Sequence, residues 1–171
     1  MNLQDDDFTL FGLKPQFAQD RAAVDARWKE LQREAHPDKF TVQSGSALRI
    51  AMQWSVRINE AYQRLKDPLK RAAYLCELGG AAINAHSNTA MPAQFLMQQM
   101  EWREALEDAM TAQSVEALLG EVQDSRKQLL QECEHCLDVQ HDPAAAVTPV
   151  RALMFIEKFA QDLNQRLDQL E

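Results

Sequence analysis

The sequence predicts an all-α protein built from two helical modules. Glycine and proline are scarce, at 5 and 6 of 171 residues, and this shortage of turn residues disfavours a fold of many short strands. Apolar residues recur at intervals of three and four over several long stretches, which is the spacing of amphipathic helices. An apolar content of 46% with 26% charged residues is typical of a globular chain rather than a disordered one.

The uneven division of charge is the second observation in favour of two modules. Residues 1–75 contain 12 basic and 10 acidic residues, a net charge of +2, whereas residues 76–171 contain 6 basic and 16 acidic residues, a net charge of −10. Such asymmetry indicates modules that meet different partners. Because phosphate contacts need Lys and Arg, the acidic half argues against a nucleic-acid partner.

The same composition bears on where the protein works. No apolar run approaches the roughly 20 residues of a membrane span, and the start MNLQDDDF lacks the basic region of a signal peptide. Three cysteines without an export signal suggest a reducing compartment rather than a disulfide framework. We therefore expect a cytoplasmic protein with no membrane partner.

The first two predicted elements begin the N-terminal module. Residues 5–15 (DDDFTLFGLKP) predict a short Asp-capped helical turn that Gly12 and Pro15 end. Residues 20–35 predict an amphipathic helix, which ends before Pro37 because the residue preceding a proline is pushed out of the α region. Its apolar stripe consists of Val24, Trp28, Leu31 and Ala35.

Residues 46–66 predict a second long helix, which should pack against the first as an antiparallel hairpin. Asp67 followed by Pro68 predicts a new short helix, which Gly79 and Gly80 end. The apolar side of this short helix comprises Leu69, Ala72, Ala73, Leu75 and Leu78. The apolar seam of the long helix comprises Leu48, Ala51, Ser55, Ile58, Tyr62 and Leu65.

Residues 81–91 resemble a linker, and the second module opens near Pro92. The apolar spacing predicts helices over roughly 92–110, 114–139 and 149–170. Three helices with short connections imply an up-down bundle.

The start of the last helix has two possible signals. Thr148-Pro149 is a cap followed by proline at the first helical position, and Asp142-Pro143 is an equally valid earlier start. We take the later start as the expectation and keep the earlier one open.

A polar turn beside a basic helix face is the first candidate site. His36, Pro37 and Asp38 lie in the turn between the two hairpin helices, and Lys29 and Arg33 lie on the outward side of the preceding helix. Such a surface can dock on an acidic partner. The tripeptide alone also fits an ordinary turn, and the two cations alone fit a solvated face.

At these residues the sequence resembles a known family. The stretch REAHPDKF, followed by INEAYQRLKDPLKRAAYL, resembles a J-domain, and the pattern DPLxRAxYLxxLxG resembles its HscB branch. HscB is the J-protein co-chaperone of iron–sulfur cluster assembly. The resemblance continues in FLMQQMEWREALED and RALMFIEKF, so it covers nearly the whole chain. One departure is Ala35, where J-domains usually place a Tyr.

The resemblance implies a domain organisation and a first partner. Residues 1–80 would form a J-domain, a helical hairpin with short flanking helices; 81–91 would be a linker, and 92–171 a C-terminal three-helix bundle that binds a scaffold. The J-domain would engage an HscA-like ATPase chaperone. Of its residues, the resemblance implies that His36, Pro37 and Asp38 trigger ATP hydrolysis and that Arg27, Lys29 and Arg33 help docking.

The predicted helix over 92–110 carries two sets of side chains. Phe95, Trp102, Leu106 and Ala109 share one side, which suits a bundle core. A second arc holds Leu96, Met97, Met100, Glu101, Glu104 and Asp108. The periodicity alone leaves open whether both apolar sets are core. The resemblance implies that this arc, together with Phe155, binds an IscU-like iron–sulfur scaffold protein.

Cys133-x-x-Cys136, with His135 and His141 nearby, is the rival signal. A C-x-x-C pair with histidine can bind zinc or act as a redox pair. Both cysteines fall on an apolar arc of their helix, so burial as small apolar side chains is the other interpretation.

The sequence contains neither GxGxxG nor GxxxxGK[ST], and no nucleophile–base arrangement stands out. We therefore expect no enzymatic activity and no cofactor. The function that these observations predict is a two-domain co-chaperone, with a metal-binding or redox protein as the alternative.

Overall fold

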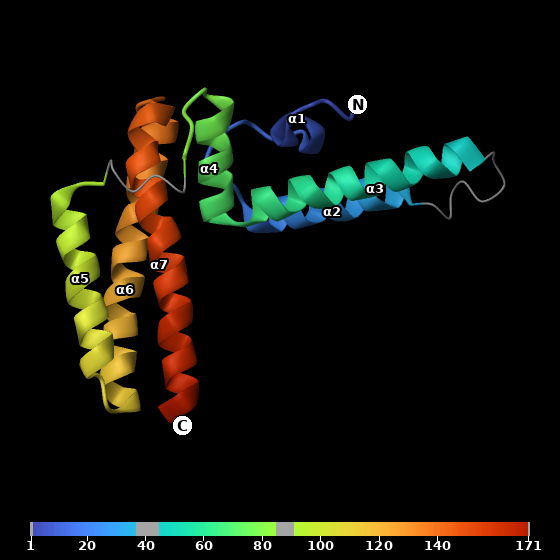
Figure 1. Ribbon diagram of the computed structural model, residues 1–171. Coiled ribbons are helices and arrows are strands. Elements are labelled where there is room, and N and C mark those ends of the chain that lie inside the picture. The colour runs from blue at the N-terminus through green and yellow to red at the C-terminus, as the bar shows by residue number, and fades with distance from the viewer. Residues whose placement is uncertain (1, 37–44, 85–90, 171) are drawn as a thin grey trace. The chain divides into compact units, whose positions relative to one another are not determined.

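The computed structural model describes residues 2–36, 45–84 and 91–170. Within these ranges the regular structure is helical and no strand occurs, which confirms the predicted all-α class (Figure 1). The chain divides into two compact units, Met1–Leu75 and Cys76–Glu171. The division falls inside α4 (Pro68–Leu78).

The first element, α1 (Asp7–Phe11), forms as its sequence predicts. The Asp6 side chain accepts a hydrogen bond from the Thr9 N–H at 3.0 Å and so caps the first turn. Gly12 ends the helix with φ of 64°, a left-handed conformation that glycine adopts without steric cost.

The hairpin of α2 (Arg21–Ala35) and α3 (Gly45–Lys66) forms the body of the N-terminal unit, and Figure 1 shows the two helices side by side. The Trp28 and Tyr62 rings stack with centroids 4.6 Å apart. Trp28 Nε1 also donates to Asn59 Oδ1 at 3.0 Å. The core of the unit consists of Phe8, Leu10, Phe11, Val24, Leu31, Ile58, Ala61 and Leu65.

The predicted apolar seam of α3 needs one correction. Leu48 is 37% exposed, whereas Ala61, which lies outside the predicted seam, is fully buried. The reason is that α1 packs against the side of α3 that carries Ala61. A seam that is predicted from the α2–α3 hairpin alone leaves out the contact between α3 and α1.

Helix α4 begins at Pro68, where the Asp67 side chain accepts the Leu69 N–H at 2.9 Å. Gly80 follows the helix with φ of 82°. Leu78 differs from the prediction because it is the last residue of the helix and is 49% exposed.

A buried ion-pair cluster joins α1 to α3. The Asp7 carboxylate is fully buried and lies 2.9 Å from Arg57 Nη1 and 2.9 Å from Arg64 Nη2. The Asp7 N–H donates to the Tyr74 hydroxyl at 2.9 Å. Two guanidinium groups therefore compensate one carboxylate that has left water, which is the condition under which a buried charge is tolerated.

The C-terminal unit contains α5 (Ala93–Asp108), α6 (Ala112–Glu134) and α7 (Pro143–Leu170), which lie side by side in Figure 1 and confirm the three-helix prediction. Helix α6 continues as a π-helical turn, η2 (His135–Val139). The Trp102 and Phe159 rings stack with centroids 6.0 Å apart. The core consists of Trp102, Ala109, Val115, Leu118, Val122, Ile156, Phe159 and Leu163.

The expected start of the last helix near residue 149 is wrong, and the earlier alternative is correct. Asp142 Oδ1 accepts the Ala145 N–H at 3.2 Å, so the carboxylate caps a helix that begins at Pro143. Pro149 lies inside the helix and is buried. The buried face continues from Ala146 through Val150, and this packing outweighs the helical hydrogen bond that a proline cannot donate.

The predicted linker over 81–91 begins with residues that are attached to the C-terminal unit. Ile83 is 5% exposed, and its carbonyl accepts a hydrogen bond from Arg151 Nε at 2.7 Å. Residues 85–90 lie outside the described residues. In the part of the chain that the structure describes, no helix is both long enough and apolar enough to span a bilayer.

We expect Asp7→Asn to lower the free energy of unfolding by about 3 kcal/mol, because two arginines would then face a neutral amide. Asp6→Asn is the matched control, since asparagine caps a helix as well as aspartate. Asp6→Asn should lower the free energy of unfolding by no more than about 0.5 kcal/mol. Urea unfolding of the full chain, followed by circular dichroism, measures both. Equal midpoints for the two variants would contradict a stabilising role of the cluster.

Candidate binding surfaces

Helix α5 presents an exposed apolar surface on the side away from its own bundle. Leu96, Met97 and Met100 are 40%, 62% and 65% exposed, whereas Trp102 on the other side is 4% exposed. The carboxylate side chains of the predicted arc are exposed as well. We call this surface the α5 face; it comprises Leu96, Met97, Met100, Glu101, Glu104 and Asp108.

The composition of the α5 face suits a protein partner. Large apolar side chains gathered on an exposed surface mark contact sites more often than isolated ones do. Methionine adds adaptability, because its unbranched thioether packs against varied shapes. The surrounding carboxylates favour a partner that brings positive charge.

Phe155 on α7 lies at the boundary between α7 and α5. Its ring meets Phe95 edge to face, with centroids 5.9 Å apart, and stacks on Phe159 at 5.7 Å. The Arg103 guanidinium carbon lies 5.3 Å from the Phe155 centroid. Phe155 is half-buried, so one part of the ring supports the core and the rest remains open to a partner.

The N-terminal candidate surface is described only in part. His36 follows the last residue of α2 in an extended conformation, with φ of −61° and ψ of 131°, and is exposed. Pro37 and Asp38 lie outside the described residues. Lys29 and Arg33 are exposed on α2, one helical turn apart.

Arg27 differs from the other two cations of α2. Its Nε donates to the Phe11 carbonyl at 3.2 Å, and its Nη1 lies 3.1 Å from the Glu30 carboxylate. Arg27 therefore helps to hold α1 against α2, and its charge is partly compensated within the unit. Lys29 and Arg33 are the cations with the more open positions.

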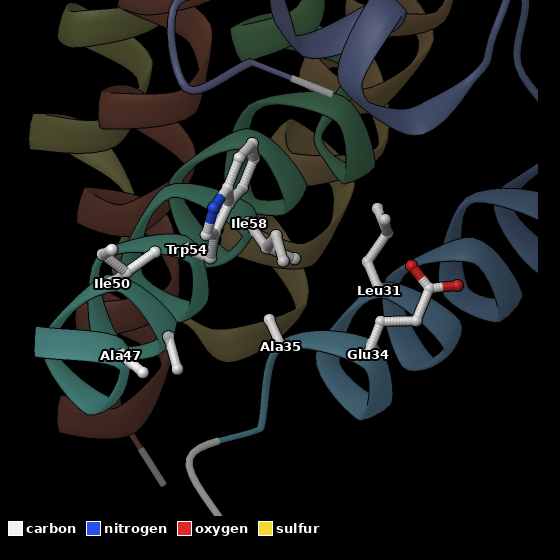
Figure 2. A pocket seen from close by; sticks show the side chains of 8 residues that line it. Leu31, Glu34, Ala35, Ala47, Ile50, Trp54 and Ile58 are labelled. Carbon is white, nitrogen blue, oxygen red and sulfur yellow. The ribbon is translucent and has the colours of Figure 1, made fainter. Parts of the chain in front are cut away.

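An apolar cleft of about 390 Å³ opens between α2 and α3 at the end of the hairpin near His36. Figure 2 shows Leu31 and Ala35 on one wall and Ile50 and Trp54 on the other. The small side chain of Ala35 forms part of the α2 wall of this cleft.

The cysteines behave as buried apolar side chains. Cys76 and Cys133 are fully buried, and Cys136 is partly exposed. Burial raises the pKa of Cys133 to about 12 and that of Cys76 to about 11, so both are thiols at neutral pH. Within residues 2–36, 45–84 and 91–170, no group of three or more His, Cys, Asp or Glu side chains could hold a metal ion.

We expect iodoacetamide at pH 8 to alkylate Cys136 before Cys133 and Cys76 in the native chain, because reaction requires both access and a thiolate. In urea the three rates should converge, since unfolding removes the burial that raises the thiol pKa values. Peptide mass spectrometry over a time course measures each site. A native Cys133 that reacts as fast as Cys136 would contradict the buried, protonated state.

Known proteins resemble this chain over its full length. A family model described as the HSCB C-terminal oligomerisation domain matches residues 91–164. The co-chaperone protein HscB homolog of Burkholderia multivorans is 48% identical over 174 residues, covering 100% of this chain and 99% of that protein. The homolog of Burkholderia cenocepacia is 47% identical over the same coverage. The chain belongs to the HscB family.

Solved HscB structures agree with this assignment. Chaperone HscB from Vibrio cholerae has a TM-score of 0.86 at 35% identity and covers 98% of this chain and 100% of its own. Human co-chaperone HscB has a TM-score of 0.92 at 25% identity, with coverage of 97% and 84%. As in HscB structures, an N-terminal J-domain precedes a C-terminal helical domain. Membership of the HscB family assigns the chain a co-chaperone role in iron–sulfur cluster assembly.

Two contacts of this HscB chain have only weak signals in the sequence. The pairing of Asp7 with Arg57 and Arg64 joins residues at least 50 positions apart, and a charged residue in a short apolar helix is its only local signal. The position of Arg103 over the Phe155 ring also has one local signal in the sequence: Arg103 is the only Lys or Arg in α5.

Proposed function

We propose that the chain is a two-sided adaptor for iron–sulfur cluster assembly. Its C-terminal domain binds an IscU-like scaffold protein through the α5 face and Phe155. Its J-domain engages an HscA-like ATPase chaperone through His36, Pro37, Asp38 and the basic side of α2. The chain thereby delivers the scaffold and stimulates ATP hydrolysis while having no enzymatic activity and no cofactor of its own.

The proposal of scaffold binding rests on the exposure of Leu96, Met97 and Met100. They lie on a helix whose opposite side already packs in the core. A helix of a small bundle needs only one apolar side, so the second one has no role inside the domain. Buried at an interface, these side chains provide affinity, while Glu101 and Glu104 favour the correct orientation.

The chaperone half rests on the family and on the open positions of Lys29 and Arg33 beside His36. Two cations on one helix side attract an acidic surface and speed its approach. The adaptor stimulates hydrolysis without a catalytic group if it binds the hydrolysis-competent conformation of the ATPase more tightly than the resting one. Both partners would be met in the cytoplasm.

The alternative of a metal or redox protein at Cys133 and Cys136 has less support. Burial keeps the pKa of Cys133 near 12, and a thiolate is the form that binds metal or attacks a disulfide. No observation in the described residues favours this function over the adaptor.

Two variants separate the halves of the proposal. We expect Met97→Ala/Met100→Ala to weaken binding of a cluster-free IscU-like scaffold by at least about tenfold, because two anchors would be lost.

We expect Asp38→Ala to bind scaffold normally but to lose stimulation of the HscA-like ATPase. Isothermal titration calorimetry and steady-state ATP hydrolysis provide the two measurements.

Met110→Ala is the matched control for the binding arm, since Met110 is 77% exposed but lies outside α5. It should bind scaffold like the wild-type chain. Unchanged affinity in the double methionine variant would refute the α5 face as the scaffold site. Normal ATPase stimulation by Asp38→Ala would refute the J-domain half.

A further inference from the structure

A groove in the C-terminal unit lies beside the α5 face and has no role in the proposed function. It has a volume of about 320 Å³ and lies between the first half of α5, the second half of α6 and the start of α7. The loop that joins α5 to α6 is at the opposite end of α5 (Figure 1), so the groove lies where no short connection holds these two helices together. We call it the α5–α6 groove.

The floor of the α5–α6 groove is apolar. Phe95 and Leu129 line it as half-buried side chains that pack against the core of the bundle. Ala152 of α7 lies between them and the core side of the groove as a small side chain that is 2% exposed. A floor that its own domain covers only in part can take up a further apolar side chain, which gains free energy by leaving water.

Side-chain amides line the walls of the groove. Gln94 and Gln98 contribute from α5 and Gln128 contributes from α6. Gln98 is half-buried, and none of the three amides forms a hydrogen bond with another residue in the part of the chain that the structure describes. Each amide offers N–H donors and a carbonyl acceptor, which are the groups that pair with a peptide main chain.

This lining favours an extended segment over a helix. The N–H and C=O groups of an extended chain need partners once water is excluded, and the glutamine amides can provide them. A helix satisfies these groups internally and, with its side chains, is about 10–12 Å wide. An extended segment uses both parts of the groove, because one apolar side chain can cover Phe95 and Leu129 while its main chain meets the amides.

The α5–α6 groove is continuous with the α5 face. Met97 follows Gln94 by three positions along α5, and Glu101 follows Gln98 by three. Residues at this spacing are neighbours on the surface of a helix. A partner that covers Met97 and Glu101 therefore lies next to the amides of the groove, with no other helix in between.

We infer that the α5–α6 groove binds an extended segment of the partner that docks on the α5 face. One apolar side chain of that segment lies on the floor, and its main chain forms hydrogen bonds with Gln98 and Gln128. The inference rests on the proposed function and adds a second contact with the same partner. Because amides carry no net charge, this contact adds affinity that salt does not screen, unlike the contribution of the carboxylates on the α5 face.

The first test titrates cluster-free IscU-like scaffold into Gln98→Leu/Gln128→Leu. Leucine fills a similar space but removes the hydrogen-bonding groups, so main-chain groups of the partner would be buried without partners. We expect binding to weaken about tenfold, with the slope of affinity against salt concentration unchanged. Gln113→Leu/Gln123→Leu is the matched control, since both glutamines are exposed on α6 and lie outside the groove. It should bind like the wild-type chain.

The second test locates the partner directly. Gln94 is exposed at the edge of the groove, so Gln94→p-benzoylphenylalanine places a photoreactive group there. We expect ultraviolet light to cross-link it to one short segment of the scaffold, which peptide mass spectrometry identifies. The same replacement at Gln123 should give no cross-link.

Three results would overturn the inference: wild-type affinity of Gln98→Leu/Gln128→Leu, no cross-link from position 94 in a complex that forms, or weakened binding together with a lowered thermal midpoint. In the last case the glutamines would support the fold instead of the partner. Failure of the proposed function is distinct, because Met97→Ala/Met100→Ala would then also bind scaffold with unchanged affinity. If only the glutamine variant keeps wild-type affinity, the α5 face stands and the groove does not.

Discussion

The stack of Trp102, Phe159 and Phe155 determines which side of α5 remains available. Trp102 of α5 stacks on Phe159 of α7 at 6.0 Å, and Phe95 of α5 meets Phe155 of α7 edge to face at 5.9 Å, so two ring contacts fix the rotation of α5 about its own axis. Aromatic pairs of this kind add specific geometry to the burial of apolar area. Rotation of α5 by one residue would expose Trp102 and bring charged residues such as Arg103 or Glu101 toward the core. The α5 face therefore exists because the opposite side is held by rings.

The two units use different means to hold their helices, and both leave one surface open. In the N-terminal unit, Asp7 with Arg57 and Arg64 attaches α1 to α3, and Arg27 attaches α1 to α2. In these contacts the charged side chains face a neighbouring helix and are paired within the unit. Lys29 and Arg33 are exposed on the outer side, where the described residues form no such contact with them, and so their charge remains available to a partner.

Periodicity and cap residues were enough to predict the fold class, the hairpin and the three-helix bundle. They failed where a contact joins distant segments: the Asp142 cap had no advantage over Thr148 in sequence, and burial of the face around Pro149 decided the earlier start. The spacing of apolar residues predicts two apolar sets on α5. The exposed fractions of Leu96, Met97 and Met100 are needed to show that the second set lies outside the core. The contact of Arg103 with the Phe155 and Phe159 rings could not be predicted from local spacing, because these rings lie more than 50 residues away, although Arg103 stands out as the one Lys or Arg of α5.

In the proposed adaptor, one chain couples two partners by bringing them together, which raises their effective concentration. Steady-state ATP hydrolysis by an HscA-like chaperone, with the chain and the scaffold added separately and together, tests this claim most directly. The account predicts that the combined rate exceeds the sum of the separate stimulations when scaffold is limiting. A combined rate equal to or below that sum would contradict it.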